Sequence, residues 1–498
     1  MRGRQGSGRF TVAAAVAIVA VALLFARELP AAPAAEARPN IVVLMTDDQT
    51  LESMRVLPKV RSLLGDHGVT FADFFANYPL CCPSRTTYFT GQYAHNHHVL
   101  YNRGSTGGFR SFRGQGTTMP VALQRAGYHT IHIGKFLNGY GKGAAPARAP
   151  VPPGWDDWNA SVDPSTYRYY GYVLNENGRP HRYTHRYQTD EYADLAVAKI
   201  RQEAAGDDPF FLDVAFLAPH AVERETSGLD AVDEAAVGYP HRRHGIRYPV
   251  PAPKYRHRFR RAALPAGPAF DQADVSKMPQ NIRDRPRFAR SEIADIRTDY
   301  RRRLATLLSV DDAVERIVGA LRDTGLLDRT VIFFMSDNGY FHGEHRIPFG
   351  KYLPYEPSIR VPLVVRGPSI ASGVTTDALA SNVDIAPTIL ELAGATPLRP
   401  PDGRSLVPVL HDPTGATVHR EILLESGRND VGAPVYHGIR TARWKYVVYD
   451  DGDRELYDLA TDPAEVHNLA GERVVEGVEA RLAAKLASVE ACAAAACP

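Results

Sequence analysis

Four short segments of the chain have the length and composition of β-strands, namely residues 41–45, 130–133, 210–216 and 331–335. The first of them, IVVLM, is a continuous apolar run without alternation. Such a run is typical of a strand that is buried on both faces of a sheet. These segments therefore predict the central strands of a layered protein.

Between these predicted strands, apolar residues recur at the spacing of α-helices. Seven apolar residues fall on one face of a long predicted helix that Gly325 can close: Leu304, Leu307, Leu308, Val314, Ile317, Val318 and Leu321. A shorter helix is predicted around residues 56–64, and another over 120–125 before Gly127. Because helices alternate with strands, we expect an α/β fold with a large, mainly parallel sheet between helices.

Polar residues follow each of the four predicted strands. Asp47-Asp48 ends the first, Lys135 the second, His220 the third and Asp337-Asn338 the fourth. Turns favour Asp and Asn, so one acidic pair by itself means little. In an open α/β sheet, however, ligands bind outside the carboxyl ends of the strands. The combination predicts that these groups converge on one site.

The acidic pairs also predict a metal. Asp47, Asp48, Asp337 and Asn338 offer three carboxylates and an amide carbonyl, which is an all-oxygen set for a hard cation. Calcium accepts about six to eight such ligands and tolerates irregular geometry. A thiolate is a poor ligand for calcium because soft sulfur prefers zinc or copper.

Residues 79–99, PLCCPSRTTYFTGQYAHNHHV, contain the densest group of reactive residues. Pro83 suits the first position of a helix, which would place Cys81 just outside a helix N-terminus, where an anion is favoured. Arg85, one turn later, can hold an oxyanion through two hydrogen bonds. We interpret the stretch as a nucleophile facing an anionic ester; the alternative is a buried cysteine beside a helix-starting proline.

The pattern C-x-P-S-R followed by Thr90-Gly91 resembles the signature of the type I, formylglycine-dependent sulfatases. The similarity covers most of the chain and is closest to the N-acetylglucosamine-6-sulfatases and the related extracellular endosulfatases. Further similar stretches are GKFLNGYG at Gly134, SDNGY at Ser336 and KYLPYE at Lys351. The resemblance implies the alkaline-phosphatase-like sulfatase fold.

The resemblance also implies roles for individual residues. Cys81, rather than Cys82, would be oxidised to formylglycine by a formylglycine-generating enzyme, and the hydrated aldehyde would join the calcium ligands Asp47, Asp48, Asp337 and Asn338. Arg85 would support the formylglycine. The remaining catalytic or substrate-binding residues would be Lys135, Asn138, His220 and Lys351. Many sulfatases have histidine where this chain has Leu137, so the leaving-group side differs from the arylsulfatase pattern.

The implied activity is hydrolysis of sulfate esters by nucleophilic catalysis. The expected substrate is a 6-O-sulfated glucosamine-type sugar, with aryl sulfates as surrogates. One alternative is a phosphonate or phosphate-ester hydrolase of the same fold. Another is a glycan-binding homologue without catalysis, although every expected polar position is filled here.

The N-terminal residues predict export. Arg2, Arg4 and Arg9 precede an apolar run over 12–26 and small residues over 31–37, as in a secretory signal peptide that could also remain as an anchor. No cysteine follows the run, which excludes a lipoprotein anchor, and we expect no stable membrane partner. The 498 residues have a net charge of +2, so nothing indicates a nucleic-acid binder.

Three domains are predicted: a signal segment over 1–37, a catalytic domain over 38–412 and a small antiparallel α+β domain over 413–498. The last contains a hairpin signal at Asp451-Gly452 and a helix over about 474–489. Of the four cysteines, Cys492 and Cys497 are the natural disulfide pair after export.

Two histidine-rich or basic stretches remain. His95, His97 and His98 lack a recognisable zinc-ligand spacing, so we expect structural or substrate-contacting roles, with structural roles favoured. Residues 222–286 are irregular and rich in Pro, Arg and His, which is usual for a solvated basic surface. Collectively this surface would attract an anionic polymer.

Overall fold

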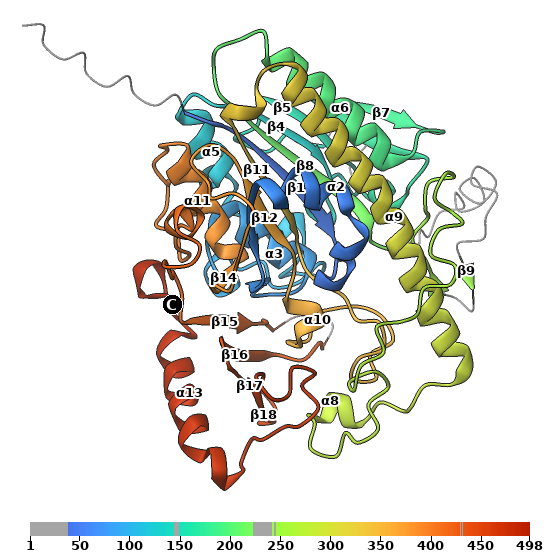
Figure 1. Cartoon of the computed structure of the whole chain (residues 1–498), viewed down its shortest axis with the longest axis vertical. Helices are drawn as coiled ribbons and strands as arrows, with labels where there is room; N and C mark the ends of the chain where they lie inside the picture. The colour runs from blue at the N-terminus through green and yellow to red at the C-terminus, as the bar shows by residue number, and fades with distance from the viewer. Residues whose placement is uncertain (1–37, 144–148, 223–241, 244–245, 429, 431) are drawn as a thin grey trace, which may run out of the picture. The chain divides into compact units, whose positions relative to one another are not determined.

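A ten-stranded mixed sheet forms the centre of the protein (Figure 1). The structure is a computed structural model that describes residues 38–143, 149–222, 242–243, 246–428, 430 and 432–498. In sheet order the strands are β13 (Val374–Thr376), β2 (Gly68–Phe71), β12 (Leu363–Arg366), β11 (Thr330–Ser336), β1 (Asn40–Asp47), β8 (Phe210–Pro219), β4 (His129–Gly134), β5 (Asp157–Ser161), β6 (Tyr172–Glu176) and β7 (Arg179–Tyr183). The strands from β11 to β5 are parallel to one another, which confirms the predicted α/β sheet.

The register of the central strands aligns their carboxyl ends. β1 lies between β11 and β8, and Thr46 is paired with Ser336. A register shift follows Met45 on the other side, so that Asp47 is opposite Pro219. The residues that follow the three strands are therefore brought to the same edge of the sheet.

Helices cover both faces of the sheet. Val42 and Leu44 of β1 point into one apolar cluster with α2 (Pro58–Leu63), α6 (Gln188–Glu203) and α9 (Arg290–Asp323). Ile41, Val43 and Met45 point into the opposite cluster, which contains side chains of α3 (Cys81–Thr90), α5 (Met119–Arg125), α11 (Ile385–Leu392) and α12 (Val407–His411). Burial on both faces explains why β1 is a continuous apolar run.

The predicted long helix is α9, which spans 34 residues. Six of the seven residues of its predicted apolar stripe are buried in the cluster with β8 and α6, and Leu308 is half-buried. Gly325, with φ of +71°, follows the helix end as predicted.

A four-stranded antiparallel sheet and a helix form the C-terminal part. The strands are β15 (Glu421–Glu425), β16 (Tyr436–Thr441), β17 (Trp444–Tyr449) and β18 (Arg454–Asp458), and the helix is α13 (Glu476–Val489). Gly452, with φ of +94°, lies in the predicted hairpin turn. The Cys492–Cys497 disulfide is also present. Residues Pro39–Pro498 form one unit, and the boundary at residue 412 stays a prediction.

The remaining α-helices and strands of the described residues are short. They are α4 (Ala94–His97), α8 (Gln280–Arg283), α10 (Glu356–Ile359), and the paired strands β3 (Phe74–Phe75) with β14 (Ala380–Ser381) and β9 (Arg242–Arg243) with β10 (Ile246–Arg247). The predicted signal segment lies outside the described residues. Among the helices in the described ranges, none has the length and apolarity needed to cross a membrane.

Candidate active site

The ends of β1 and β11 bring two acidic pairs together. The backbone N–H of Asp48 donates to Asp337 Oδ1 at 3.2 Å, and Asn338 Nδ2 donates to Asp48 Oδ1 at 2.7 Å. Asp48 has a positive φ of 67°, a conformation that aspartate adopts more readily than most residues. Asp47, Asp48, Asp337 and Asn338 are all buried.

Cys81 is the first residue of α3, not a residue outside the helix as the sequence predicted, and Pro83 is the third. The first four N–H groups of a helix have no partner within it, so proline is tolerated at any of these positions and does not fix the start. Cys81 is fully buried, and its Sγ lies 3.5 Å from Asp47 Oδ1 and 3.1 Å from Lys351 Nζ.

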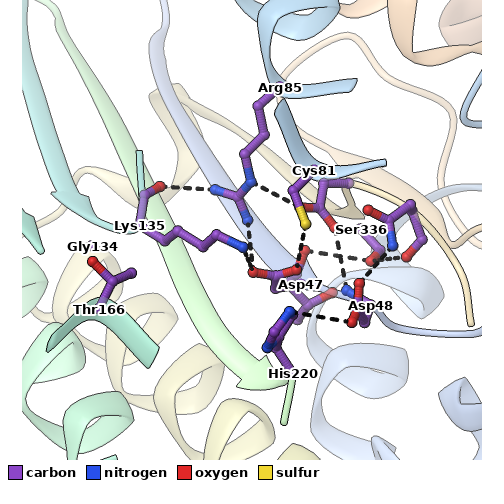
Figure 2. Close-up of polar contacts among 12 residues, drawn as sticks. Asp47, Asp48, Cys81, Arg85, Gly134, Lys135, Thr166, His220 and Ser336 are labelled. Atoms are coloured by element: carbon purple, nitrogen blue, oxygen red, sulfur yellow. Dashed lines mark hydrogen bonds and ion pairs between the residues drawn. The ribbon is translucent and has the colours of Figure 1, made fainter. Parts of the chain in front are cut away.

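Cationic side chains surround the acidic pairs (Figure 2). Arg85 Nε donates to Asp337 Oδ2 at 2.8 Å, and its Nη1 donates to the Lys135 carbonyl at 2.8 Å. Lys135 forms an ion pair with Asp47. Lys351 forms one with Asp48.

His220 approaches the same carboxylates from the end of β8. Its Nε2 lies 3.6 Å from Asp48 Oδ2, and its Nδ1 lies 2.6 Å from the carbonyl oxygen of Ala221. A carbonyl only accepts, so Nδ1 carries the hydrogen in that contact. In the neutral imidazole, Nε2 therefore presents a lone pair towards the three carboxylates of Asp47, Asp48 and Asp337, which we call the acidic cluster.

The buried carboxylates differ in their pKa values. Burial alone would raise the pKa of Asp47, but Lys135, His220, Arg85 and Lys351 outweigh it and hold the pKa well below its usual range. Burial and the charge of Asp47 raise the pKa of Asp337 to about 6. The three closely spaced carboxylates thus depend on nearby positive charge to remain ionised.

The other titratable groups respond to the same environment. Burial, followed by the charge of Asp47, raises the pKa of the Cys81 thiol to about 12. Burial lowers the pKa of His220 to about 4, although Asp48 and Asp47 oppose this. Burial would lower the pKa of Lys351, but Asp48 and Cys81 raise it well above its ordinary value. At neutral pH the lysine is charged, whereas the thiol and imidazole are neutral.

The donor set fits a hard cation. Potential ligand atoms of Asp47, Asp48, Cys81 and His220 all lie within 4.8 Å of one another. Asn338 Oδ1 is buried and has no hydrogen-bond partner. Because burying an unpaired carbonyl oxygen costs free energy, this atom is available as a metal ligand. Carboxylate and amide oxygens are the ligands that Ca2+ prefers.

Asn138 lies beside this cluster. Its backbone N–H donates to Cys82 Sγ at 3.2 Å, so it contacts the neighbour of Cys81. His95 and His97 are engaged elsewhere, with Glu425 and with Thr87 respectively, and His98 is exposed. None of these three histidines belongs to the acidic cluster.

Arg303 is a site residue that sequence reasoning missed. Its Nη1 lies 3.9 Å from Asp48 Oδ2, its Nε donates to Asp299 Oδ2 at 2.7 Å, and its guanidinium carbon lies 3.3 Å from the centre of the Tyr340 ring. It follows Arg301 and Arg302 in α9, so the sequence offered only a run of arginines. The one available signal was its position next to Leu304, the first residue of the predicted apolar stripe, which could have indicated that Arg303 is buried.

Comparison with known proteins adds two family matches. Residues 39–395 match the family described as sulfatase. Residues 343–492 match the C-terminal region of N-sulphoglucosamine sulphohydrolase.

Individual relatives resemble the chain over nearly its whole length. An arylsulfatase of Volvox carteri is 34% identical over 95% of this chain and 78% of its own. The human N-acetylglucosamine-6-sulfatase is 32% identical over 94% of this chain and 88% of its own. A solved structure described as bound to its substrate D-glucosamine-2-N,6-O-disulfate is 25% identical, with a TM-score of 0.68, and covers 90% of this chain and 97% of its own.

Proposed function

The chain belongs to the sulfatase family, whose members hydrolyse sulfuric esters, and we propose that it removes the 6-O-sulfate of a glucosamine-type sugar. The main observation in support is that Cys81 contacts both Asp47 and Lys351. A cysteine that can be modified thus lies next to both the acidic cluster and a positively charged side chain. The substrates named for the human relative and for the bound structure support the choice of sugar.

The proposed nucleophile is formylglycine made from Cys81. A thiol whose pKa is raised to about 12 is protonated at neutral pH and is a poor nucleophile. It is also a poor neighbour for calcium. A hydrated aldehyde at this position would supply an oxygen nucleophile and a second hydroxyl, whose deprotonation would let the C=O bond reform as the C–O bond to sulfate breaks.

The proposed metal ligands are Asp47, Asp48, Asp337 and Asn338, together with the modified residue 81. Bound Ca2+ would supply Lewis-acid stabilisation of negative charge at the reacting oxygens. The orphaned Asn338 Oδ1 and the three buried carboxylates support this assignment.

The cations of the site have separate proposed roles. Lys135 and Lys351, both charged at neutral pH, would hold sulfate oxygens. Arg85 would keep Asp337 and residue 81 in place through its hydrogen bond to Asp337. His220 would deliver a proton to the departing sugar oxygen. Because the pKa of the His220 imidazole is about 4 without ligand, the bound anionic substrate would first have to raise that pKa so that the imidazole is protonated.

Asn138 would act on the substrate side of the site, next to Cys82. The proposed location is extracellular or in the cell envelope, based on the signal pattern over residues 1–37. There the enzyme would meet sulfated saccharides, after a formylglycine-generating enzyme has acted on Cys81.

The test is a comparison of substrates with protein whose Cys81 modification has been quantified by peptide mass spectrometry over residues 79–85. N-acetylglucosamine-6-sulfate, a nitrophenyl sulfate and an aryl phosphonate would be compared by kcat/KM. We expect sulfate esters to be preferred over the phosphonate and the sugar to be desulfated. Preference for the phosphonate would favour the alternative hydrolase, and inactivity of fully modified protein on all three would refute the proposal.

A further inference from the structure

Five arginines from two separate segments surround a hollow of about 170 Å³ on the described surface. We name this set the arginine cluster; it consists of Arg256, Arg258, Arg260, Arg301 and Arg302. The first three lie in successive turns after β10, and the last two lie in α9. A water molecule occupies about 30 Å³ in the liquid, so the hollow has room for a tetrahedral oxyanion.

The hollow has defined walls. Arg301 Nε donates to the carbonyl of Ala262 at 2.8 Å and so ties the turns to the helix. The guanidinium of Arg302 lies 4.8 Å from the centre of the Tyr248 ring. Arg260 Nη2 lies 2.5 Å from His257 Nδ1, and the guanidinium of Arg258 lies 5.8 Å from the centre of the Phe259 ring. Arg256, Arg258 and Arg260 are nevertheless exposed to solvent.

Among the described residues, no carboxylate pairs with the exposed arginines of the cluster, Arg256, Arg258 and Arg260. Slight desolvation, and then the charges of Arg260 and Arg256, lower the pKa of the exposed His257 between them.

The acids of α9 near the hollow are engaged with other groups. Asp299 pairs with Arg303, Asp312 pairs with Lys59 and Lys254, and Asp295 accepts from the hydroxyl of Tyr248. An anion entering the hollow would therefore meet several guanidinium groups, which favour sulfate through charge-assisted hydrogen bonds.

Helix α9 contributes residues both to the arginine cluster and to the candidate active site. Arg302 directly precedes Arg303, whose Nη1 lies 3.5 Å from the Asp48 carbonyl and 3.9 Å from its carboxylate. One turn of helix rises about 5.4 Å, so Arg301 and Arg302 begin within a turn of a residue that touches the acidic cluster. One face of α9 thus contributes Arg303 to the candidate active site, and another face contributes Arg301 and Arg302 to the arginine cluster.

We propose that the arginine cluster is a second anion site, which holds one sulfate of a polysulfated carbohydrate chain while another sulfate of that chain occupies the site at Cys81. This rests on the proposed function and extends its substrate from a single sugar to a polymer. A lipid surface fits less well, because among described residues the exposed large apolar side chains are Val151 and Val474, neither of which lies in the cluster.

The test is the triple variant Arg256→Ala/Arg258→Ala/Arg260→Ala, which changes only exposed side chains. The matched control is Arg125→Ala/Arg201→Ala/Arg481→Ala, which removes the same charge from exposed positions on α5, α6 and α13. We expect the cluster variant to lose about tenfold in kcat/KM on a heparin-type chain, from three exposed charge contacts. Its kcat/KM on N-acetylglucosamine-6-sulfate should match that of the control.

Binding separates this inference from the proposed function. On immobilised heparin, wild type and control should elute at the same salt concentration, and the cluster variant at a lower one. This result would support the second site even if no sugar were desulfated. Equal elution of all three proteins would overturn it, as would single-stranded DNA or anionic vesicles binding as tightly as heparin with the same dependence on the three arginines.

Discussion

The Nζ atom of Lys351 lies 3.1 Å from the Sγ atom of Cys81, although 270 positions separate the two residues in the sequence. Lys351 also forms an ion pair with Asp48, so one ammonium group contacts both the cysteine and the acidic cluster. A positive charge fixed between these groups can bind an anionic ester at the point where Cys81, once modified, would react.

Replacement of Cys81 should abolish activity, and replacement of Cys82 should not. Cys81 faces Asp47 and Lys351, whereas Cys82 contacts Asn138. We expect Cys81→Ala to show no sulfate-ester hydrolysis above background and Cys82→Ala to retain much of the wild-type kcat/KM. Peptide mass spectrometry should find formylglycine at position 81 in both wild type and Cys82→Ala. The reverse pattern would assign the modification to Cys82.

Calcium should stabilise the folded protein through the acidic cluster. At a free calcium concentration about 100-fold above Kd, the free energy of unfolding should rise by about 2.7 kcal/mol. Asp48→Asn should lose most of this increase, because the amide is neutral and Asp48 lies at the centre of the cluster. Thermal unfolding with and without calcium measures the effect.

The matched control for calcium binding is Asp213→Asn. Asp213 is an equally buried carboxylate that bonds to His132 and Tyr88, outside the acidic cluster. This variant should keep the calcium-dependent increase even if its overall stability falls. Active protein that contains stoichiometric zinc, with neither calcium nor magnesium, would contradict the proposed metal.

Loss of His220 should affect sugar substrates more than aryl substrates. A sugar alkoxide is a poor leaving group and needs a proton, whereas an aryl oxide is already stabilised. We expect His220→Ala to lower kcat/KM for N-acetylglucosamine-6-sulfate by about 100-fold or more, and that for a nitrophenyl sulfate far less. His98→Ala changes an exposed histidine outside the site and serves as the control. Equal losses on both substrates would exclude a proton-donating role.

His95 should make stability depend on pH. Burial alone would lower its pKa, but the hydrogen bond and charge of Glu425, 2.6 Å away, raise the pKa to about 9 from 6.5. Because the folded-state pKa is the higher one, the stabilisation is complete below pH 6.5 and is lost as pH rises through 9. His95 is partly exposed to solvent, so we expect about 1–2 kcal/mol.

Urea unfolding of wild type and His95→Gln at about pH 6 and about pH 10 tests this linkage. The difference in unfolding free energy between the two proteins should be larger at the lower pH. His98→Gln, at an exposed neighbour, should show no such change. A difference that is the same at both pH values would rule out a charged His95–Glu425 pair.

Local sequence patterns were sufficient to predict the main elements of the fold. The apolar run of β1 and the helical stripe of α9 are local patterns, and burial of an apolar surface follows from them wherever the segment lies. The polar residues after β1, β4, β8 and β11 could be grouped because parallel strands present their carboxyl ends at one edge of the sheet. The Cys492–Cys497 disulfide followed from cysteine count and spacing.

Contacts between side chains that are distant in the sequence could be established only from the folded structure. Proline tolerates several positions in the first turn, so the sequence did not fix the start of α3 at Cys81. Arg303 resembles Arg301 and Arg302 in sequence, yet only Arg303 contacts both Asp48 and Tyr340. The reason is that hydrophobic periodicity is a local property, whereas an ion pair depends on loop paths and on helix rotation relative to the sheet, which the packing of the whole chain sets.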